Sequence, residues 1–223
     1  MIGLLASTSE VLRREGVGEL VRRAIRKLLR PVIQVNRWYF LEGDHADPPS
    51  PPPPPARVPL EIRLARPKDF EAHAEDLRRV HQEAAKVEGR LARGDVAMLG
   101  LVEGQLAHVQ WLAFASPIDI EEVGVRLFLG PGETYSYGVE TLPEWRGHGI
   151  HPVMSFRRTE YERAWGIVRH VSYVAASNTF SLKTVGRLSR RRTKTVSTIR
   201  LLGTRRLVLG ATREGRPHLV PLP

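Results

Sequence analysis

Apolar positions along residues 59–223 recur with two different spacings, and their alternation predicts a mixed α/β domain. Short apolar runs bounded by glycine, proline or polar residues predict strands at 60–65, 95–102, 105–115, 133–141 and 170–176. Apolar residues at helical spacing predict helices at 67–91, 149–165 and 180–188. An apolar stretch at 123–129 and two basic strands at 194–202 and 205–211 complete the pattern. We expect a central mixed sheet flanked by helices.

Residues 1–46 form a separate N-terminal extension in this pattern. Between residues 17 and 32, apolar side chains recur at helical spacing, and arginines and lysines occupy much of the remaining surface. This predicts an amphipathic basic helix that ends near Pro31. Such a helix either packs on its own domain or a partner subunit, or lies on an anionic lipid surface. The segment 37–41, Arg-Trp-Tyr-Phe-Leu, is either a short strand or an aromatic anchor.

A proline-rich segment at 47–58 separates the extension from the domain at 59–223. Prolines occupy every position from 51 to 55. Proline lacks the backbone N–H that helices and sheets use, so the segment predicts an extended polyproline linker. It either spaces the first helix from the domain or serves as a ligand for a proline-binding module.

The segment 146–150, Arg-Gly-His-Gly-Ile, carries the most specific chemistry in the chain. It follows a predicted strand and opens a predicted helix. The first amides of a helix have no internal partner, and the helix dipole adds positive charge there. Gly147 and Gly149 let the backbone approach a phosphate closely. The arrangement predicts an anion cradle, which in a mixed α/β chain indicates a nucleotide-derived cofactor.

With Pro143 three residues before Arg146, the pattern Arg-x-x-Gly resembles the acyl-CoA pyrophosphate loop of the GNAT superfamily of N-acetyltransferases. Residues 62–70 are similar to that family's first strand and the start of its first helix. The motif Asn-x-x-Ser at 178–181 follows a second apolar strand, where the family places it. The resemblance covers roughly residues 60–210. It implies the GNAT fold, acetyl-CoA or another acyl-CoA as co-substrate, and direct attack of a primary amine on the thioester.

The resemblance also assigns residues to the cofactor. Backbone amides of the loop and the Arg146 guanidinium would hold the pyrophosphate. The strand end at 139–141 would pair with the pantetheine arm and polarise the thioester carbonyl. His151 and Asn178 are each either a cofactor contact or a helix cap, and Pro152 departs from the family pattern. The cofactor-binding set is Val139, Thr141, Arg146, Gly147, His148, Gly149, Ile150, His151 and Asn178.

A base must remove a proton from the acceptor amine, and the strand before the loop carries two candidate carboxylates, Glu133 and Glu140. Strand alternation places Glu133, Tyr135 and Tyr137 on one face and Glu140 on the other, unless a bulge changes the parity. Tyr135 and Tyr137 either line the acceptor pocket or belong to the core. The tyrosine with which many family members protonate the leaving thiolate is absent from residues 178–186.

Charge and composition limit the classes of molecule that the protein is expected to bind. The formal net charge is +10, and the segment from residue 181 to the end carries eleven lysines and arginines against one acidic residue. These basic side chains either form a solvated strand edge or attract the cofactor, an acidic substrate, an acyl carrier protein or a membrane surface. Nucleic acid is less favoured, because no recognition motif accompanies the charge. There is no cysteine, and no histidine spacing on a helix indicates a metal.

No apolar run is long enough to span a bilayer, so we expect a cytoplasmic protein, either free or peripheral at the inner membrane face. Two functions are consistent with the residues. The first is an N-acyltransferase that moves an acetyl or other acyl group from coenzyme A to a small amine, for which the basic strands suggest an anionic acceptor. The second is a catalytically altered acyl-CoA-binding module tethered to a membrane or protein partner, motivated by the missing tyrosine and by His151-Pro152.

Overall fold

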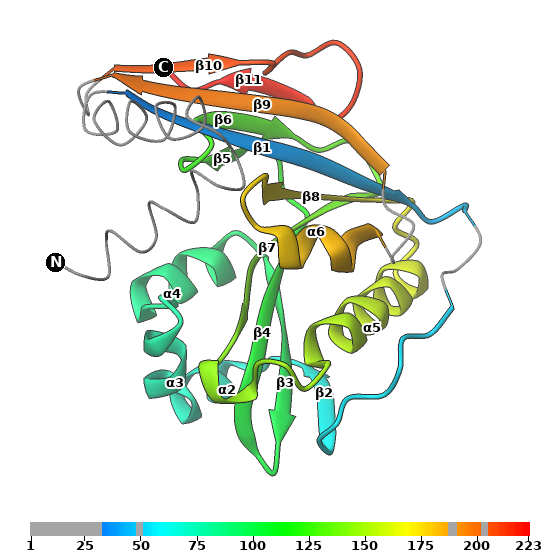
Figure 1. Cartoon of the computed structure of the whole chain (residues 1–223). Coiled ribbons are helices and arrows are strands. Elements are labelled where there is room, and N and C mark those ends of the chain that lie inside the picture. The colour runs from blue at the N-terminus through cyan, green and yellow to red at the C-terminus, as the bar shows by residue number, and fades with distance from the viewer. Residues whose placement is uncertain (1–32, 48–50, 187–190, 202–204) are drawn as a thin grey trace, which may run out of the picture.

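The computed structural model describes residues 33–47, 51–186, 191–201 and 205–223, and its body is one eight-stranded sheet (Figure 1). In spatial order the strands are β10 (Arg205–Leu209), β9 (Arg191–Leu201), β1 (Ile33–Asp44), β8 (Arg169–Ala175), β7 (Glu133–Thr141), β4 (Gln105–Ala113), β3 (Val96–Val102) and β2 (Leu60–Leu64). A small second sheet has the order β11 (His218–Pro221), β6 (Val125–Phe128) and β5 (Ile118–Ile120). The two sheets share a hydrophobic cluster.

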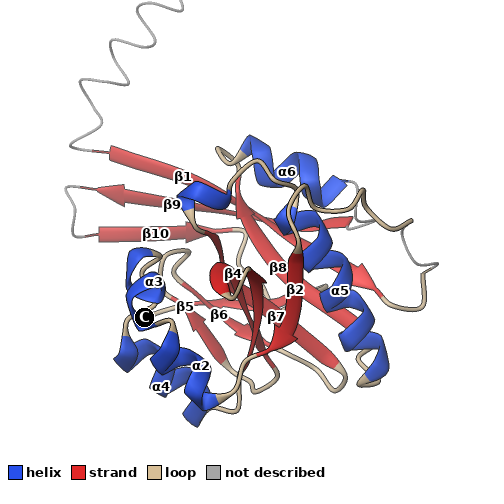
Figure 2. Cartoon of the chain, turned by 90° about the horizontal axis from the view of Figure 1, so that it is seen from below, coloured by secondary structure: helices blue, strands red, loops and turns tan. Residues whose placement is uncertain are grey.

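Helices cover both faces of the main sheet. One face carries α5 (Ile150–Ala164) and α6 (Thr179–Gly186), and the other carries α2 (Pro67–Ala72), α3 (Ala74–Arg79) and α4 (Ala84–Ala92) (Figure 2). A short 3-10 helix, η1 (Pro143–Trp145), leads from β7 towards α5. The predicted fold class is therefore confirmed, and each predicted strand has a counterpart with ends shifted by a few residues.

Strand β1 lies in the middle of the main sheet, between β8 and β9, and pairs antiparallel with both. Phe40 is fully buried and Leu41 is 3% exposed, so this strand contributes to the core. The predicted domain boundary at residue 46 is wrong for residues 33–44, which belong to the domain. The strand interpretation of residues 37–41 is confirmed. The amphipathic helix predicted between residues 17 and 32 lies outside the described residues.

The proline-rich segment lies against the domain. Residues 51–55 have no regular secondary structure, as predicted for an extended linker. The Arg57 N–H donates a hydrogen bond to the carbonyl oxygen of His148 at 2.8 Å, and Ala56 packs against the cluster that contains Ile150. The segment therefore supports the loop that precedes α5 and is not a free spacer at this end.

Three short helices, α2, α3 and α4, replace the single helix predicted at 67–91. Their apolar side chains still share one buried face, and they pack around Trp111. The first break falls at His73, where φ is −114° and ψ is 23°, and the second follows Val80, where His81 has a left-handed φ of 60°. Apolar spacing identifies the buried face, but it does not show where the backbone must turn to follow a twisted sheet.

A fully buried carboxylate, Glu162, joins the helical layer to the sheet. One of its oxygens accepts a hydrogen bond from the Thr134 hydroxyl at 2.7 Å and lies 2.8 Å from Nδ1 of His170, and the other lies 3.1 Å from Nε2 of His45. Arg158, one turn earlier on α5, is also buried, and its Nε lies 3.8 Å from the carboxylate. These partners belong to β7, β8, the turn after β1, and α5, so one side chain connects four segments.

We predict that Glu162→Gln destabilises the fold by about 3–5 kcal/mol, because it leaves the buried Arg158 guanidinium without a counter-ion. Burial by itself raises the pKa of Glu162, but Arg158 and His170 hold it well below the ordinary value of 4.5. The stabilisation is therefore complete above pH 4.5 and declines as the pH falls below it. Urea unfolding at pH 7 and at pH 4 measures both effects.

Glu160→Gln is the matched control, because Glu160 lies on the exposed side of the same helix and pairs with the exposed Arg157 at 2.8 Å. Exposed pairs add little stability. Equal losses of stability in the two variants would contradict the role given to Glu162.

Candidate functional site

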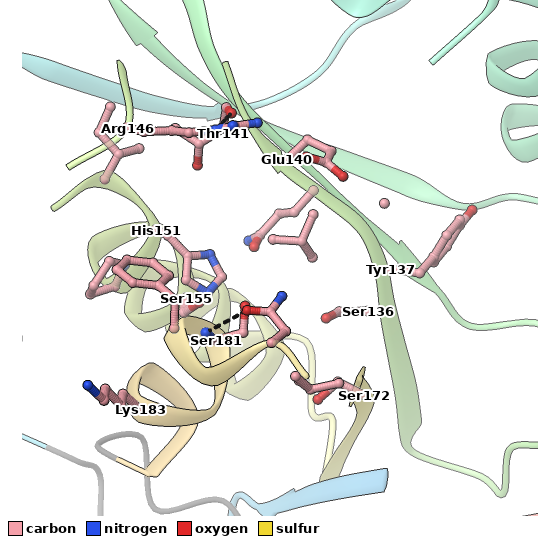
Figure 3. Close-up of a pocket in the computed structure, with 18 of the residues that line it drawn as sticks. Ser136, Tyr137, Glu140, Thr141, Arg146, His151, Ser155, Ser172, Ser181 and Lys183 are labelled. Carbon is pink, nitrogen blue, oxygen red and sulfur yellow. Dashed lines mark hydrogen bonds between the residues drawn. The ribbon is translucent and has the colours of Figure 1, made fainter. Parts of the chain in front are cut away.

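The site begins where β7 and β8 stop pairing. Their parallel pairing covers only three positions, from Glu133 opposite Arg169 to Tyr135 opposite Val171. Beyond these, a cleft of about 1210 Å³ opens between the two strands. Figure 3 shows side chains around it from β7 (Ser136, Tyr137, Glu140, Thr141), α5 (His151, Ser155), β8 (Ser172) and α6 (Ser181, Lys183).

The loop before α5 forms the mouth of this cleft. Gly147 and Gly149 have φ values of +82° and +76°, which other residues adopt only with strain. Gly149 is the N-cap of the 15-residue helix α5, so the unpaired amides of that helix begin here. Arg146 Nε donates to the carbonyl oxygen of Thr141 at 3.1 Å, which anchors the guanidinium at the end of β7. The predicted loop lies at the mouth of the cleft. Its lining residues there are Thr141, Arg146, Gly147, Gly149 and Ile150.

The polar candidates near the loop have different surroundings. His151 lines the cleft, whereas His148 does not, and the His148 carbonyl oxygen accepts the hydrogen bond from the linker. Asn178 Oδ1 accepts a hydrogen bond from the Ser181 N–H at 3.0 Å, which confirms the helix-cap interpretation. Asn178 also lines the cleft, so it is available to a ligand there.

A β-bulge at Gly138, which has a φ of +55°, changes the side-chain parity of β7 because the pairing with β4 shifts there. Tyr137 lies opposite Trp111, and Glu140 lies opposite Val109. Both partners belong to the core cluster under α2, α3 and α4. Residues directly opposite share a face, so Tyr137 and Glu140 point to the same side. The uninterrupted alternation that put them on opposite faces is wrong.

Thr141 turns to the other face, towards α5. Its hydroxyl lies 2.8 Å from Nδ1 of the fully buried His108, whose ring lies 5.7 Å from that of His151. Burial and, to a smaller degree, His151 lower the pKa of His108 well below its usual range, so this ring is neutral. Val139 and Thr141, both predicted to contact the pantetheine arm, line the cleft.

Of the two predicted bases, only Glu140 reaches the cleft. It is half-buried, and burial raises the pKa of its carboxyl group against the opposing influence of Arg146. Glu133 lies at the opposite end of β7 and is 8% exposed. Its carboxylate accepts hydrogen bonds from Arg169 at 2.8 Å and Arg216 at 2.9 Å. Two guanidiniums occupy this carboxylate and it does not line the cleft, so the structure speaks against Glu133 as the base.

The two tyrosines that were candidates for the acceptor pocket lie in different surroundings. Tyr135 is 2% exposed and belongs to the core cluster with Phe40 and Val171, as the core alternative predicts. Tyr137 lines the cleft, and its hydroxyl donates to Asp95 at 2.5 Å. Burial and this hydrogen bond raise the pKa of Tyr137 above its ordinary value. The Tyr137 ring therefore lines the cleft, and its hydroxyl proton is engaged in the hydrogen bond to Asp95.

Some lining residues were not found from the sequence. The Trp38 and Tyr173 rings meet edge to face at 5.7 Å. The exposed residue Glu122 also lines the cleft, and desolvation raises the pKa of its carboxyl group. The aromatic segment 37–41 draws attention to Trp38, but the position of Trp38 beside the cleft depends on the pairing of β1 with β8. Glu122 stands in a turn and has no local signal.

The basic C-terminal strands lie at the far edge of the main sheet from β2 (Figure 1). Lys194 donates to three backbone carbonyls in the loop 212–217, at 2.7, 3.0 and 2.7 Å. Arg191 pairs with Asp47 at 2.9 Å. These two cations have structural partners, which favours the strand-edge interpretation for them.

No family model and no curated protein matches the sequence, but solved structures do. A GCN5-related N-acetyltransferase from Sphaerobacter thermophilus aligns with 80% of the chain at 15% identity and a TM-score of 0.53. A Novosphingobium aromaticivorans protein assigned to the GNAT family of acetyltransferases aligns with 81% at 17% identity and 0.53. A Drosophila protein aligns with 85% at 15% identity and 0.52. The chain spans 56%, 67% and 59% of these proteins, respectively.

At this level of identity the comparisons establish the fold, which is that of the GCN5-related N-acetyltransferases. The resemblance seen in the sequence is confirmed to that extent. In the part of the chain that the structure describes, no helix is long and apolar enough to cross a membrane. Among the same residues, no three histidine or acidic side chains gather so that they could hold a metal ion.

We predict that Gly138→Ala destabilises the protein more than Gly166→Ala. Both glycines have left-handed φ values, +55° and +74°, so each substitution adds backbone strain of about 1–2 kcal/mol. A Cβ at position 138 would also lie 3.1 Å from Cδ1 of Trp111, whereas at position 166 it meets nothing within 4 Å. Urea unfolding compares the two variants, and equal losses would contradict close packing at the bulge.

Proposed function

We propose that this protein is an N-acyltransferase that moves an acyl group from coenzyme A to a primary amine. One observation carries the proposal: the cleft between β7 and β8 joins a helix N-terminus suited to anions, at Gly149 and Ile150, to a half-buried carboxylate, Glu140. A donor held at the mouth would present its thioester near a base. The fold shared with GCN5-related N-acetyltransferases supports the same reaction class.

The residues at the mouth fit a coenzyme A donor. The amides of residues 147–150 would hold the pyrophosphate, and Arg146 would add charge-assisted hydrogen bonds. Pro152 lacks an N–H, so the first turn of α5 offers one donor fewer. Within the described residues, β7 pairs with β4 alone beyond Tyr135, which leaves its other edge for the amides of a pantetheine arm. The donor supplies a thioester carbonyl that amines can attack.

The proposed reaction is a direct transfer without a covalent enzyme intermediate. A neutral amine nitrogen attacks the thioester carbonyl carbon, a C–N bond forms, and the C–S bond breaks to leave the coenzyme A thiolate. Glu140 accepts the proton that the amine loses, directly or through one water. Because α6 carries no tyrosine, solvent returns a proton to the leaving sulfur.

The proposed acceptor is a small primary amine. The cleft is lined by two carboxylates, the half-buried Glu140 and the exposed Glu122, and by three aromatic rings, those of Trp38, Tyr137 and Tyr173. Carboxylates beside aromatic faces favour a cationic amine. The anionic acceptor suggested by the basic strands stays a prediction. So do an acyl carrier protein as donor, contact of the N-terminal helix with a membrane, and a cytoplasmic location.

A second candidate function is a module that binds acyl-CoA without transferring the acyl group, tethered to a membrane or protein partner. The sequence of α6, which has no tyrosine, and the proline in the first turn of α5 favour it. Binding of coenzyme A with no transfer to a broad panel of amines would support this candidate.

We predict that the protein binds coenzyme A and acetyl-CoA in calorimetric titrations, and that Arg146→Ala weakens both. Loss of a hydrogen bond to a charged group costs about 1.5–3 kcal/mol, which corresponds to roughly a tenfold to hundredfold lower affinity. Arg157→Ala, on the exposed side of α5, is the control and is expected to bind as the wild type does. Failure of the wild type to bind either ligand would rule out the proposed donor.

We predict that Glu140→Gln lowers kcat by about a hundredfold to ten-thousandfold while donor binding persists. Because burial raises the pKa of Glu140 above 4.5, the carboxylate becomes available as the pH rises through that raised value. The wild-type rate should therefore rise over this range, and the rate of the variant should not. Glu144→Gln, in the exposed pair with Arg79, is the control. An unchanged kcat in the Glu140 variant would exclude it as the base.

A further inference from the structure

The face of α5 that packs on the main sheet is polar where an apolar face is expected. Its buried residues are Ile150, Met154, Ser155, Arg158 and Glu162. A helix on a sheet normally buries an apolar stripe. On α5 the buried residues are apolar in the first turn and polar from Ser155 onwards. The change from apolar to polar residues therefore falls within the part of the helix that lines the cleft.

Arg158 is the centre of this polar face. Its side chain is 2% exposed, and its Nη1 contacts the ring of His170. Its Nη2 makes two long hydrogen bonds, to the Ser155 carbonyl at 3.5 Å and the Thr159 hydroxyl at 3.3 Å. Within the described residues its Nε has no hydrogen-bond partner. A buried N–H without an acceptor is unfavourable, and more so in a charged group.

Glu162 compensates this guanidinium only in part. The distance of 3.8 Å from Nε to the carboxylate is too long for a hydrogen bond. The Glu162 oxygens are instead engaged by Thr134, His170 and His45. Arg158 and Glu162 therefore do not form the bidentate pair that usually satisfies a buried guanidinium.

Arg158 lines the same cleft as the proposed donor site. It is joined there by the buried polar residues Ser136, Ser155, Ser172 and Gln110. Figure 3 shows Ser136 and Ser172 on the two strands and Ser155 on α5, around the inner part of the cleft. Ser136 and Ser172 directly follow the last paired residues, Tyr135 and Val171, so they mark the closed end of the cleft.

The position of Arg158 along α5 relates it to the acyl end of a donor. Eight residues separate it from Ile150, which is roughly 12 Å along the helix axis. A molecule held by its pyrophosphate at Gly149 and extended along β7 would reach the closed end with its far terminus. An acetyl methyl group offers nothing to a buried guanidinium and three hydroxyls, whereas a carboxylate accepts hydrogen bonds from both.

We propose that the acyl group carried by this protein ends in a carboxylate, as in succinyl-CoA, and that Arg158 with Ser136 and Ser172 binds that carboxylate. This inference rests on the proposed function, because it takes coenzyme A as the carrier. The acyl terminus fills the closed end of the cleft, and its oxygens accept hydrogen bonds from the Arg158 guanidinium and from the two serine hydroxyls.

The test is a calorimetric titration of the full chain with coenzyme A, butyryl-CoA and succinyl-CoA. Butyryl and succinyl groups have the same number of carbons, and only succinyl ends in a carboxylate. We expect succinyl-CoA to bind roughly tenfold to hundredfold more tightly than butyryl-CoA. Equal affinities, or tighter binding of butyryl-CoA, would overturn the inference and leave the proposed function standing. No binding of any of the three would remove both.

Two variants then test which residues cause the preference for succinyl-CoA. Arg158→Met is expected to abolish the preference for succinyl-CoA over butyryl-CoA, and Arg158→Lys to retain part of it. Because Arg158→Met leaves Glu162 without its cation, Ser172→Ala provides a milder change that is expected to reduce the preference. A preference for succinyl-CoA that survives in both Arg158→Met and Ser172→Ala would overturn the assignment of these residues.

Discussion

The hydrogen bonds of Glu162 hold the cleft in shape. The parallel contact between β7 and β8 extends over only three residue pairs, which is little to keep two strands together. Glu162 reinforces that contact because Thr134 lies on β7 and His170 on β8, while its own helix passes over both. The strands are thus fixed at one end and free to separate at the other. The N-cap of the same helix is Gly149, so the fixed end also determines where the amides proposed to bind phosphate lie.

The bulge at Gly138 makes a second connection between packing and chemistry. Without it, strand alternation would direct Tyr137 and Glu140 to opposite faces. With it, both lie on the side of α2, α3 and α4, and Thr141 turns towards α5. The cleft therefore has the loop 146–150 on one side, where we propose that the donor binds, and the Glu140 carboxylate on the other, where we propose that the acceptor binds. A glycine is needed there because its φ is left-handed and Trp111 lies close to the position of a Cβ.

The sequence predicts those parts of the fold that depend on local signals. The loop 146–150, the strands and α5 were found because glycines, proline and apolar periodicity act over a few residues. The place of β1, the breaks around α3 and the parity of β7 depend on pairing with distant segments, so local sequence signals do not determine them. The choice between Glu133 and Glu140 shows the consequence: both are strand carboxylates, and only long-range contacts with Arg169 and Arg216 distinguish them.

The polar face of α5 is not explained by stability alone. Replacing a buried ion pair with well-packed apolar residues is often neutral or stabilising by about 1–4 kcal/mol, so leucines could join α5 to the sheet at least as well. The polar residues are also not spread along the helix, because Ile150 and Met154 make an ordinary apolar contact near the mouth. Ser155 lines the cleft together with Arg158, whose Nε has no hydrogen-bond partner among the described residues. The partners of Glu162 account for the connection to the sheet, whereas Ser155, Ser136 and Ser172 line the cleft. A ligand whose far end is anionic gives all of them the same role.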